Sequence, residues 1–169
     1  MKPNQLYILL LTLLLLSACG SPERSLKRGD AAMAIGEYCE AAAQYKKGYS
    51  RIAPTDRKRR GEVAYKMGEA FRRYGNTARA LGAFRNAARY GMNDTLTQFY
   101  IGEMLRMQGD YRGAEKAYQT YLDSFPNDER ARRILQSLNE AIAIKERGSA
   151  YTVKIESMFS GSRSDYAPA

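Results

Sequence analysis

Small and aromatic residues recur at a fixed interval along the middle of this 169-residue chain. The pairs separated by 34 residues are Gly68 and Gly102, Gly75 and Gly109, Ala80 and Ala114, and Phe84 and Tyr118. Two contiguous units, residues 61–94 and 95–128, contain all of these positions. A period of this length, with small residues where helices approach and aromatic residues where they interlock, is typical of stacked helix–turn–helix repeats. Such arrays present extended binding surfaces, so the pattern favours binding over catalysis.

A degenerate unit precedes these two and spans about residues 22–55. Its residues at the matching internal positions are Gly29, Gly36, Ala41 and Tyr45. They lie 39 residues before their counterparts, which is one 34-residue unit plus five inserted residues, Asp56 to Arg60. After the last unit, residues 129–147 predict one amphipathic helix that covers the apolar end of the array. The side chains expected to face the array are Leu135, Leu138, Ile142 and Ile144.

Residues 25–147 resemble a tetratricopeptide repeat domain. The resemblance rests on the glycine register, on the apolar stripe of Ile101 and Leu105 beside Gly102, and on Gly109-Asp110-Tyr111 at the turn. It implies an all-α fold, a solenoid of three helix–turn–helix repeats (about 22–55, 61–94 and 95–128) plus a C-terminal capping helix at 129–147. The first helix of each repeat then lines a concave groove.

Counting from the glycine register gives the side chains that face this groove. They are Tyr65, Glu69, Arg72 and Arg73 in the second repeat, Phe99, Glu103, Arg106 and Met107 in the third, and Arg130 and Arg133 on the capping helix. Aromatic residues among arginines and glutamates suit an extended peptide or a partner helix, since Tyr and Arg are enriched at binding hot spots. The alternative is that Tyr65 and Phe99 belong to the core between repeats, with the charges solvating the surface.

The densest run of charge is Arg57-Lys58-Arg59-Arg60, a basic loop or helix start within the insertion. The chain carries a net charge of +9, an excess that suits nucleic acid, anionic lipid or an acidic protein. For a secreted protein nucleic acid is excluded. The run is interpreted either as a contact with lipid or an acidic partner, or as a solvated helix start.

The N-terminus resembles a bacterial lipoprotein signal. Lys2 precedes an apolar run from Leu6 to Leu16, which is too short to span a bilayer, and Ser17-Ala18-Cys19 follows. The resemblance implies cleavage after residue 18 and acylation of Cys19, with acyl chains such as palmitate holding the protein to a membrane. Residues 19–24 would form a lipidated tether. By the same resemblance, Gly20 and Ser21 favour the outer membrane and the periplasmic face.

The chain has no histidine, which excludes Ser/His and Cys/His catalysis and the common histidine metal sites. No enzyme activity, cofactor or metal is expected. With Cys19 acylated, Cys39 has no intramolecular partner for a disulfide. We expect Cys39 to be a half-buried helix residue; the alternative is a thiol that pairs with a partner.

Residues 148–169 change character. Tyr151, Val153 and Ile155 alternate with polar residues, which predicts a strand or an unstructured tail. The segment from Ser160 to Pro168 is similar to the start of a β-propeller in Bacteroidetes outer-membrane lipoproteins, in which repeats, propeller and a peptidoglycan-binding domain similar to outer-membrane protein A follow one another. One branch serves type IX (Por) secretion. The resemblance implies a non-enzymatic scaffold in a secretion or envelope-spanning complex, with indirect peptidoglycan association. The alternative is an accessory lipoprotein of outer-membrane protein assembly.

Overall fold

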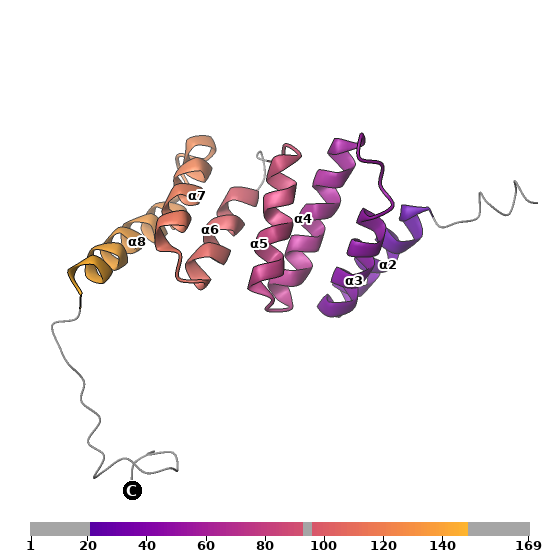
Figure 1. Ribbon diagram of the computed structural model, residues 1–169, viewed down its shortest axis with the longest axis horizontal. Helices are drawn as coiled ribbons and strands as arrows, with labels where there is room; N and C mark the ends of the chain where they lie inside the picture. The colour runs from indigo at the N-terminus through magenta and orange to yellow at the C-terminus, as the bar shows by residue number, and fades with distance from the viewer. Residues whose placement is uncertain (1–20, 93–95, 149–169) are drawn as a thin grey trace, which may run out of the picture.

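The computed structural model describes residues 21–92 and 96–148. Within these residues every regular element is an α-helix, and consecutive helices pack side by side in an elongated array (Figure 1). The helices are α2 (Pro22–Ala34), α3 (Tyr38–Tyr49), α4 (Arg57–Arg73), α5 (Thr77–Arg89), α6 (Thr97–Met107), α7 (Tyr111–Ser124) and α8 (Glu129–Arg147). The pairs α2/α3, α4/α5 and α6/α7 form three repeats and α8 follows them, so the predicted all-α repeat fold is confirmed.

Several predictions fall on the remaining residues. The signal segment 1–18, the lipidation site Cys19 and the strand-like tail beyond Gly148 lie outside the described residues and stay predictions. One local prediction needs correction. Helix α2 begins at Pro22, so residues 22–24 belong to its first turn and not to a tether; proline suits this turn because its missing N–H needs no partner there. Of the two alternatives for the basic run, a loop or a helix start, the structure shows the helix start, since Arg57–Arg60 form the first turn of α4 behind its N-cap Asp56.

The recurring glycines set the distance between the paired helices. A Cβ added to Gly68 would lie 2.7 Å from the ring of Phe84, and one added to Gly102 would lie 2.8 Å from the ring of Tyr118. Gly29 meets Tyr45 in the same way. Each aromatic ring therefore lies directly against the backbone of the first helix, and all three rings are almost completely buried. Close approach at a missing side chain is why the 34-residue register begins with glycine.

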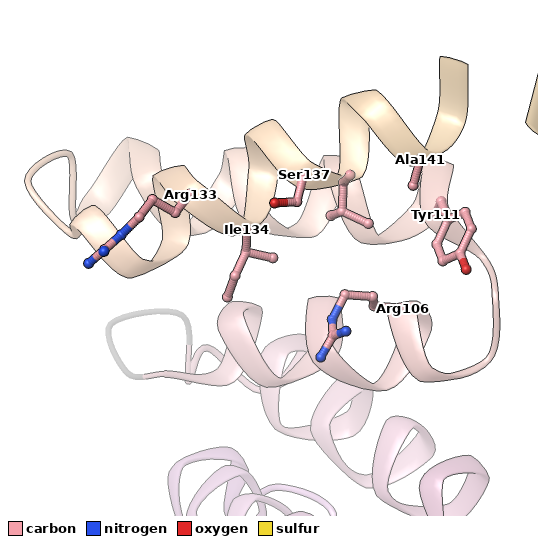
Figure 2. Close-up of a pocket in the computed structure, with 7 residues that line it drawn as sticks. Arg106, Tyr111, Arg133, Ile134, Ser137 and Ala141 are labelled. Carbon is pink, nitrogen blue, oxygen red and sulfur yellow. The ribbon is translucent and has the colours of Figure 1, made fainter. Parts of the chain in front are cut away.

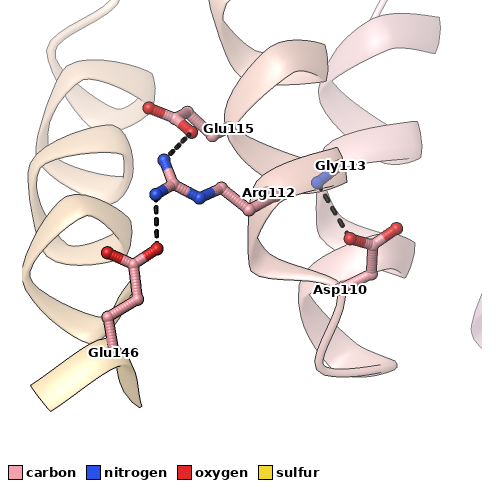
Figure 3. Close-up of polar contacts among 5 residues, drawn as sticks. All are labelled: Asp110, Arg112, Gly113, Glu115 and Glu146. Atoms are coloured by element: carbon pink, nitrogen blue, oxygen red, sulfur yellow. Dashed lines mark hydrogen bonds and ion pairs between the residues drawn. The ribbon is translucent and has the colours of Figure 1, made fainter. Parts of the chain in front are cut away.

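The turn within each repeat also needs glycine. Gly36, Gly75 and Gly109 have φ between +77° and +84°, in the left-handed region that L-residues with side chains avoid. The residue after the second and third of these glycines caps the next helix: the Asn76 side chain accepts a hydrogen bond from the Arg79 N–H (3.1 Å), and that of Asp110 accepts one from the Gly113 N–H (2.9 Å, Figure 3).

The antiparallel helices give the array two long edges. The turn edge carries the turns within repeats, at residues 35–37, 74–76 and 108–110. The inter-repeat edge carries the segments that join repeats, at residues 50–56 and 90–92, together with the first turns of α2 and α4 (Figure 1). Contacts across the inter-repeat edge confirm this grouping, because Arg59 pairs with Glu23 of α2 and Arg57 donates to the carbonyl of Arg89 at the end of α5 (3.1 Å).

Helix α8 covers the end of the array, as predicted. Leu138 and Ile142 are buried and Leu135 packs partly against the core. Ile144 is the exception, since it is 62% exposed and faces away from α7 and the core. Arg112 of α7 bridges Glu115 of its own helix (3.4 Å) and Glu146 of α8 (2.5 Å), which ties the end of the cap to the third repeat (Figure 3). Gly148 ends the helix with φ of +73°.

Candidate functional site

The candidate site is the surface formed by α4, α6 and α8, the first helices of successive units; we call it the first-helix face. Its floor is aromatic. The ring of Tyr100 on α6 stacks on Phe84 with 5.2 Å between centroids and lies 6.3 Å from that of Tyr65 on α4. The Arg72 guanidinium lies over the Tyr100 ring, 4.7 Å from its centroid. Tyr65 and Tyr100 are only half-buried, so this floor offers flat apolar surface with an arginine above it.

A carboxylate holds that arginine in place. Glu69 accepts hydrogen bonds from two nitrogens of Arg72, at 2.8 and 3.1 Å, and lies 3.9 Å from a nitrogen of Arg73. The hydrogen bond to Glu69 raises the pKa of Arg72, so its charge is secure at any physiological pH. Burial, together with the nearby Glu69 carboxylate, raises the pKa of Tyr65 to about 12, and its hydroxyl stays protonated as a donor.

The third repeat uses the equivalent glutamate differently. Tyr118 of α7 donates a hydrogen bond to Glu103, which also pairs with Arg106 at 3.3 Å. Burial and the Glu103 carboxylate raise the pKa of Tyr118. Glu103 is therefore bound from both sides within the protein. Arg106 remains partly exposed at 44% of its side chain, and its guanidinium is available to a ligand.

Between α6 and α8 the first-helix face opens into a hollow of about 420 Å³. Figure 2 shows α8 above and α6 below, with Ile134 pointing down toward α6 and Arg106 standing on α6 beneath α8. The hollow is lined by Arg106, Tyr111, Arg133, Ile134, Ser137, Leu138 and Ala141. Ile134, Leu138 and Ala141 supply an apolar surface on the α8 side, and the two arginines supply positive charge. An apolar side chain flanked by a carboxylate matches this combination of groups.

A smaller hollow of about 250 Å³ lies at the other end of the face, between the first and second repeats. Asp30 accepts hydrogen bonds from Tyr45 (2.8 Å) and Lys66 (2.7 Å) at its margin. Burial of Asp30 opposes its ionisation, but the hydrogen bonds from Lys66 and Tyr45 lower the pKa of its carboxyl below the ordinary value. Both bonds end on the Oδ1 atom of Asp30, whose side chain is 49% exposed.

The structure does not bring all the predicted site residues together. Phe99 is 4% exposed and packs edge-on against Tyr118 and Tyr121, so it belongs to the core, which is the alternative that the sequence left open. Arg130 covers it, with its guanidinium 4.8 Å from the ring centroid. Arg73 lies over Tyr38 of α3 at the turn edge, and Met107, 61% exposed, ends α6 at the same edge.

Tyr100 is the site residue that the sequence analysis missed. It stands next to Phe99 at the start of α6, and neighbouring residues on a helix point about 100° apart. Two adjacent aromatic residues therefore cannot both face the groove. The 34-residue register could have identified Tyr100. Its equivalent in the second repeat is Lys66, which contacts the preceding repeat through Asp30, just as Tyr100 contacts the second repeat.

The basic run is more ordered than a solvated helix start. The Arg60 guanidinium lies 4.5 Å from the Tyr49 ring centroid and 5.7 Å from that of Tyr90, and it donates to the carbonyl of Ile52 (3.2 Å). Arg57 also lies over Tyr90. Cys39 differs from expectation as well. It is exposed in the first turn of α3.

The described residues contain no cluster of three or more potential metal ligands among His, Cys, Asp and Glu. Nor do these residues include a helix with the length and apolar character needed to cross a bilayer. What the first-helix face offers is an aromatic floor, fixed guanidiniums and an open hollow. Groups of these kinds suit the binding of a ligand and not its chemical conversion.

Comparisons with known proteins agree with this architecture. Residues 65–129 match the family model described as tetratricopeptide repeat. The Sgt2 tetratricopeptide domain from Aspergillus fumigatus superposes with a TM-score of 0.61 at 21% identity, covering 83% of this chain and 91% of that one. The first such domain of Spaghetti (RPAP3), bound to the HSP90 peptide SRMEEVD, gives 0.63 at 21% identity, covering 73% and 94%.

A third similar structure is the Yersinia enterocolitica type III secretion chaperone SycD in complex with a peptide of the translocator YopD. Its TM-score is 0.56 at 16% identity, with 73% of this chain and 93% of that chain covered. No curated protein sequence matches the chain. At these identities the structural likeness establishes the fold alone. The described residues thus have a helical-repeat fold similar to that of tetratricopeptide domains, and residues 65–129 match the tetratricopeptide repeat model by sequence.

Proposed function

We propose that this protein is a non-enzymatic scaffold that binds an extended peptide or helix of a protein partner on its first-helix face. The observation that carries the proposal is the hollow between α6 and α8, where apolar Ile134 and Leu138 lie opposite the guanidinium of Arg106. The stacked pair of Tyr100 and Arg72 continues this surface toward the second repeat. Two of the structural neighbours described above hold peptides, which is consistent with this use of the fold.

The charges of the face specify the partner further. Glu69 and Glu103 are already bound by arginines of the same helices. Arg133 instead has a 78% exposed side chain that contacts only Glu129, through the carboxylate at 3.9 Å and the backbone carbonyl at 3.4 Å. Unsatisfied hydrogen-bonding capacity on the face therefore belongs mainly to guanidinium groups, which bind carboxylates in bidentate geometry. A segment that presents an apolar anchor beside acidic side chains fits the hollow best.

The proposal extends to the location of the scaffold. Acylation of Cys19 would anchor it to the outer membrane, facing the periplasm, as the lipoprotein-like signal suggests. Helix α2 begins at Pro22, so only residues 20 and 21 would separate the acylated cysteine from the array. We place the protein in a secretion or envelope-spanning complex of the type IX kind, on the resemblance of residues 160–168, with any peptidoglycan contact being indirect.

The test compares binding of fluorescent peptides to wild type and to a variant with Arg72→Gln, Arg106→Gln and Arg133→Gln. The peptides alternate acidic and apolar residues, and a matched set carries lysine in place of each acid. We expect the acidic set to bind at least ten-fold more tightly than the lysine set, and the variant to lose that preference. The same two proteins are then used in crosslinked pull-downs from envelope membranes, to identify the natural partner.

The matched control replaces three exposed basic residues on second helices, with Lys46→Gln, Arg85→Gln and Lys116→Gln. Circular dichroism and thermal unfolding must show that both variants fold like wild type. Phe99 is left intact, because truncating a buried aromatic residue costs about 3–5 kcal/mol and would confuse binding with folding. Equal loss of binding in both variants, or no preference for acidic peptides, would overturn the proposed site.

A further inference from the structure

The inter-repeat edge of the first two repeats gathers positive charge that the first-helix face does not use. Residues Lys47, Arg51, Arg57 and Lys58 are exposed there. Among the described residues, none of these four has a carboxylate oxygen within 4 Å of its charged nitrogens. Three carboxylates belong to the same edge or to α4. Glu23 pairs with Arg59, Asp56 caps α4, and Glu62 is exposed.

The turn edge differs although it also carries arginines. Arg73 pairs there with Glu69 at 3.9 Å, and Arg112 with Glu115 and Glu146. Its exposed large residues are apolar: Ile35 at 73%, Tyr74 at 53% and Met107 at 61%. Arg79, in the first turn of α5, is also exposed at the turn edge and has no ion pair among the described residues. Within the first two repeats, a cluster of several unpaired cations is therefore a property of the inter-repeat edge, whereas exposed apolar side chains characterise the turn edge.

Aromatic stacking concentrates the charge of the inter-repeat edge. The Tyr90 ring has the guanidiniums of Arg57, Arg60 and Arg89 within 5.5 to 5.7 Å of its centroid. Tyr49 donates a hydrogen bond to the Tyr90 hydroxyl (3.4 Å), and this bond, followed by the neighbouring guanidiniums, lowers the pKa of Tyr90. Three cations held around one half-buried tyrosine form a fixed positive surface with an amphipathic ring at its centre.

From these observations we propose that the inter-repeat edge of the first two repeats lies against the surface of an anionic phospholipid bilayer. Charge complementarity favours this occupant, because clustered Lys and Arg gain free energy from a field of anionic headgroups and tyrosine suits the interface. Chain geometry favours it too. Glu23, in the first turn of α2, pairs with Arg59, so the chain enters the array at this same edge.

That second argument rests on the anchor proposed above. An acyl chain on Cys19 would hold the array by its inter-repeat edge, with the basic surface toward the headgroups and the turn edge away from them. The first-helix face would then be perpendicular to the membrane surface and accessible to a partner. The two surfaces would act together, one setting the orientation of the scaffold and the other binding.

The experiment measures which edge approaches the membrane. Full-length protein is extracted from membranes and reconstituted into vesicles of phosphatidylcholine, with or without about 30% phosphatidylglycerol, that carry a headgroup quencher. A fluorophore is placed on the native Cys39, which is exposed at the turn edge, or on Thr55→Cys in a Cys39→Ser background at the inter-repeat edge. Mass spectrometry confirms a single label at the intended cysteine.

We expect strong quenching at position 55 and weak quenching at position 39, only with phosphatidylglycerol, and loss of the difference in 0.5 M salt because salt screens exposed charges. The substitutions Lys47→Gln, Arg51→Gln and Lys58→Gln should reduce quenching at position 55 to its level on neutral vesicles. The matched substitutions Lys116→Gln, Lys145→Gln and Arg147→Gln should leave it unchanged. These control residues are exposed and lie away from the basic surface.

Equal quenching at both positions would overturn the proposal, as would quenching at position 55 that persists on neutral vesicles. If the substitutions at the basic edge abolish capture of the protein partner and leave quenching on anionic vesicles unchanged, the edge is a protein-binding surface and the membrane proposal is wrong. The lipid anchor is tested separately, by flotation with neutral vesicles. Absence of flotation would show that the protein carries no lipid anchor, and quenching on anionic vesicles would still report whether the inter-repeat edge faces the membrane.

Discussion

The second and third repeats share one register but differ by a single hydroxyl where their helices lock together. In the second repeat Phe84 lies against Gly68, and Glu69 turns to Arg72 and Arg73. In the third, Tyr118 lies against Gly102 and donates to the glutamate that follows that glycine. The packing is the same, but the Tyr118 hydroxyl donates a hydrogen bond to Glu103, and the Arg106 side chain is more exposed than that of Arg72. The 34-residue period thus fixes how the paired helices pack, and the hydroxyl oxygen of Tyr118 changes which charged side chains are available to a ligand.

Removal of either aromatic ring should have the largest effect. Phe84 and Tyr118 are both fully buried, so Phe84→Ala and Tyr118→Ala should each lower the free energy of unfolding by about 3–5 kcal/mol. Urea denaturation followed by circular dichroism measures the change. A cost below about 1 kcal/mol at either position would contradict the shared packing of the two repeats.

Addition of a methyl group at the glycine should come next. The Cβ of Gly102→Ala would meet the buried Tyr118 ring at 2.8 Å, and overpacking of this kind costs about 1–3 kcal/mol. Gly82→Ala is the matched control, since Gly82 is also helical but has no atom within 4 Å of an added Cβ. It should stabilise the protein by up to about 1 kcal/mol through helix propensity. The opposite signs are the test, and stabilisation by both substitutions would show that the glycine contact is loose.

Exchange of the hydroxyl between repeats sharpens the comparison. Tyr118→Phe removes a hydrogen bond to a charged acceptor and should cost about 1.5 kcal/mol. Phe84→Tyr should give no comparable gain, because Arg72 already binds both oxygens of Glu69. Thermal unfolding of the two variants and of the double exchange measures both effects. A neutral Tyr118→Phe would mean that Arg106 alone satisfies Glu103.

The smallest effect concerns the caps of the second helices. Asn76 caps α5 and Asp110 caps α7 in the same geometry, but only the aspartate adds a negative charge at the helix N-terminus. Asn76→Asp should stabilise and Asp110→Asn should destabilise by about 0.3–1 kcal/mol each at low salt. High salt should shrink both changes. Changes of the same sign would indicate that hydrogen-bond geometry and not charge distinguishes the two caps.

Much of this fold was predictable because the same residue types recur at equivalent positions of the three repeats. Gly68 and Gly102 reappear as Gly29 in the first repeat, and all three proved to face an aromatic ring of the paired helix. The capping helix followed from its apolar spacing, with Leu138 and Ile142 buried as expected. Ile144 continued the same pattern but is exposed, because it lies on the side of α8 that faces away from α7, whereas Lys145 and Glu146 contact Tyr111 and Arg112.

The candidate site was predictable only in part. Arg72 and Arg106 were found from the register, whereas Tyr100 was missed and Phe99 was placed in the groove although it is buried. A register counts residues along one helix, but the direction of a side chain relative to the neighbouring repeat depends on how the repeats are rotated against each other. The stacking of Arg60 between Tyr49 and Tyr90 joins three helices and has no local signature in the sequence.

The sequence alone determined the helices, the turns and the spacing of the repeats, because these depend on backbone freedom at glycine, on caps and on apolar periodicity within a few tens of residues. Tertiary structure decided which charges remain available. Glu69 and Glu103 occupy the same position of the repeat, yet the helix packed behind each one sets its partner. Likewise the basic cluster forms at the inter-repeat edge only when antiparallel packing brings the starts of α2 and α4 beside the ends of α3 and α5. Local free energies fix the elements, whereas electrostatic character arises from distances between residues far apart in the chain.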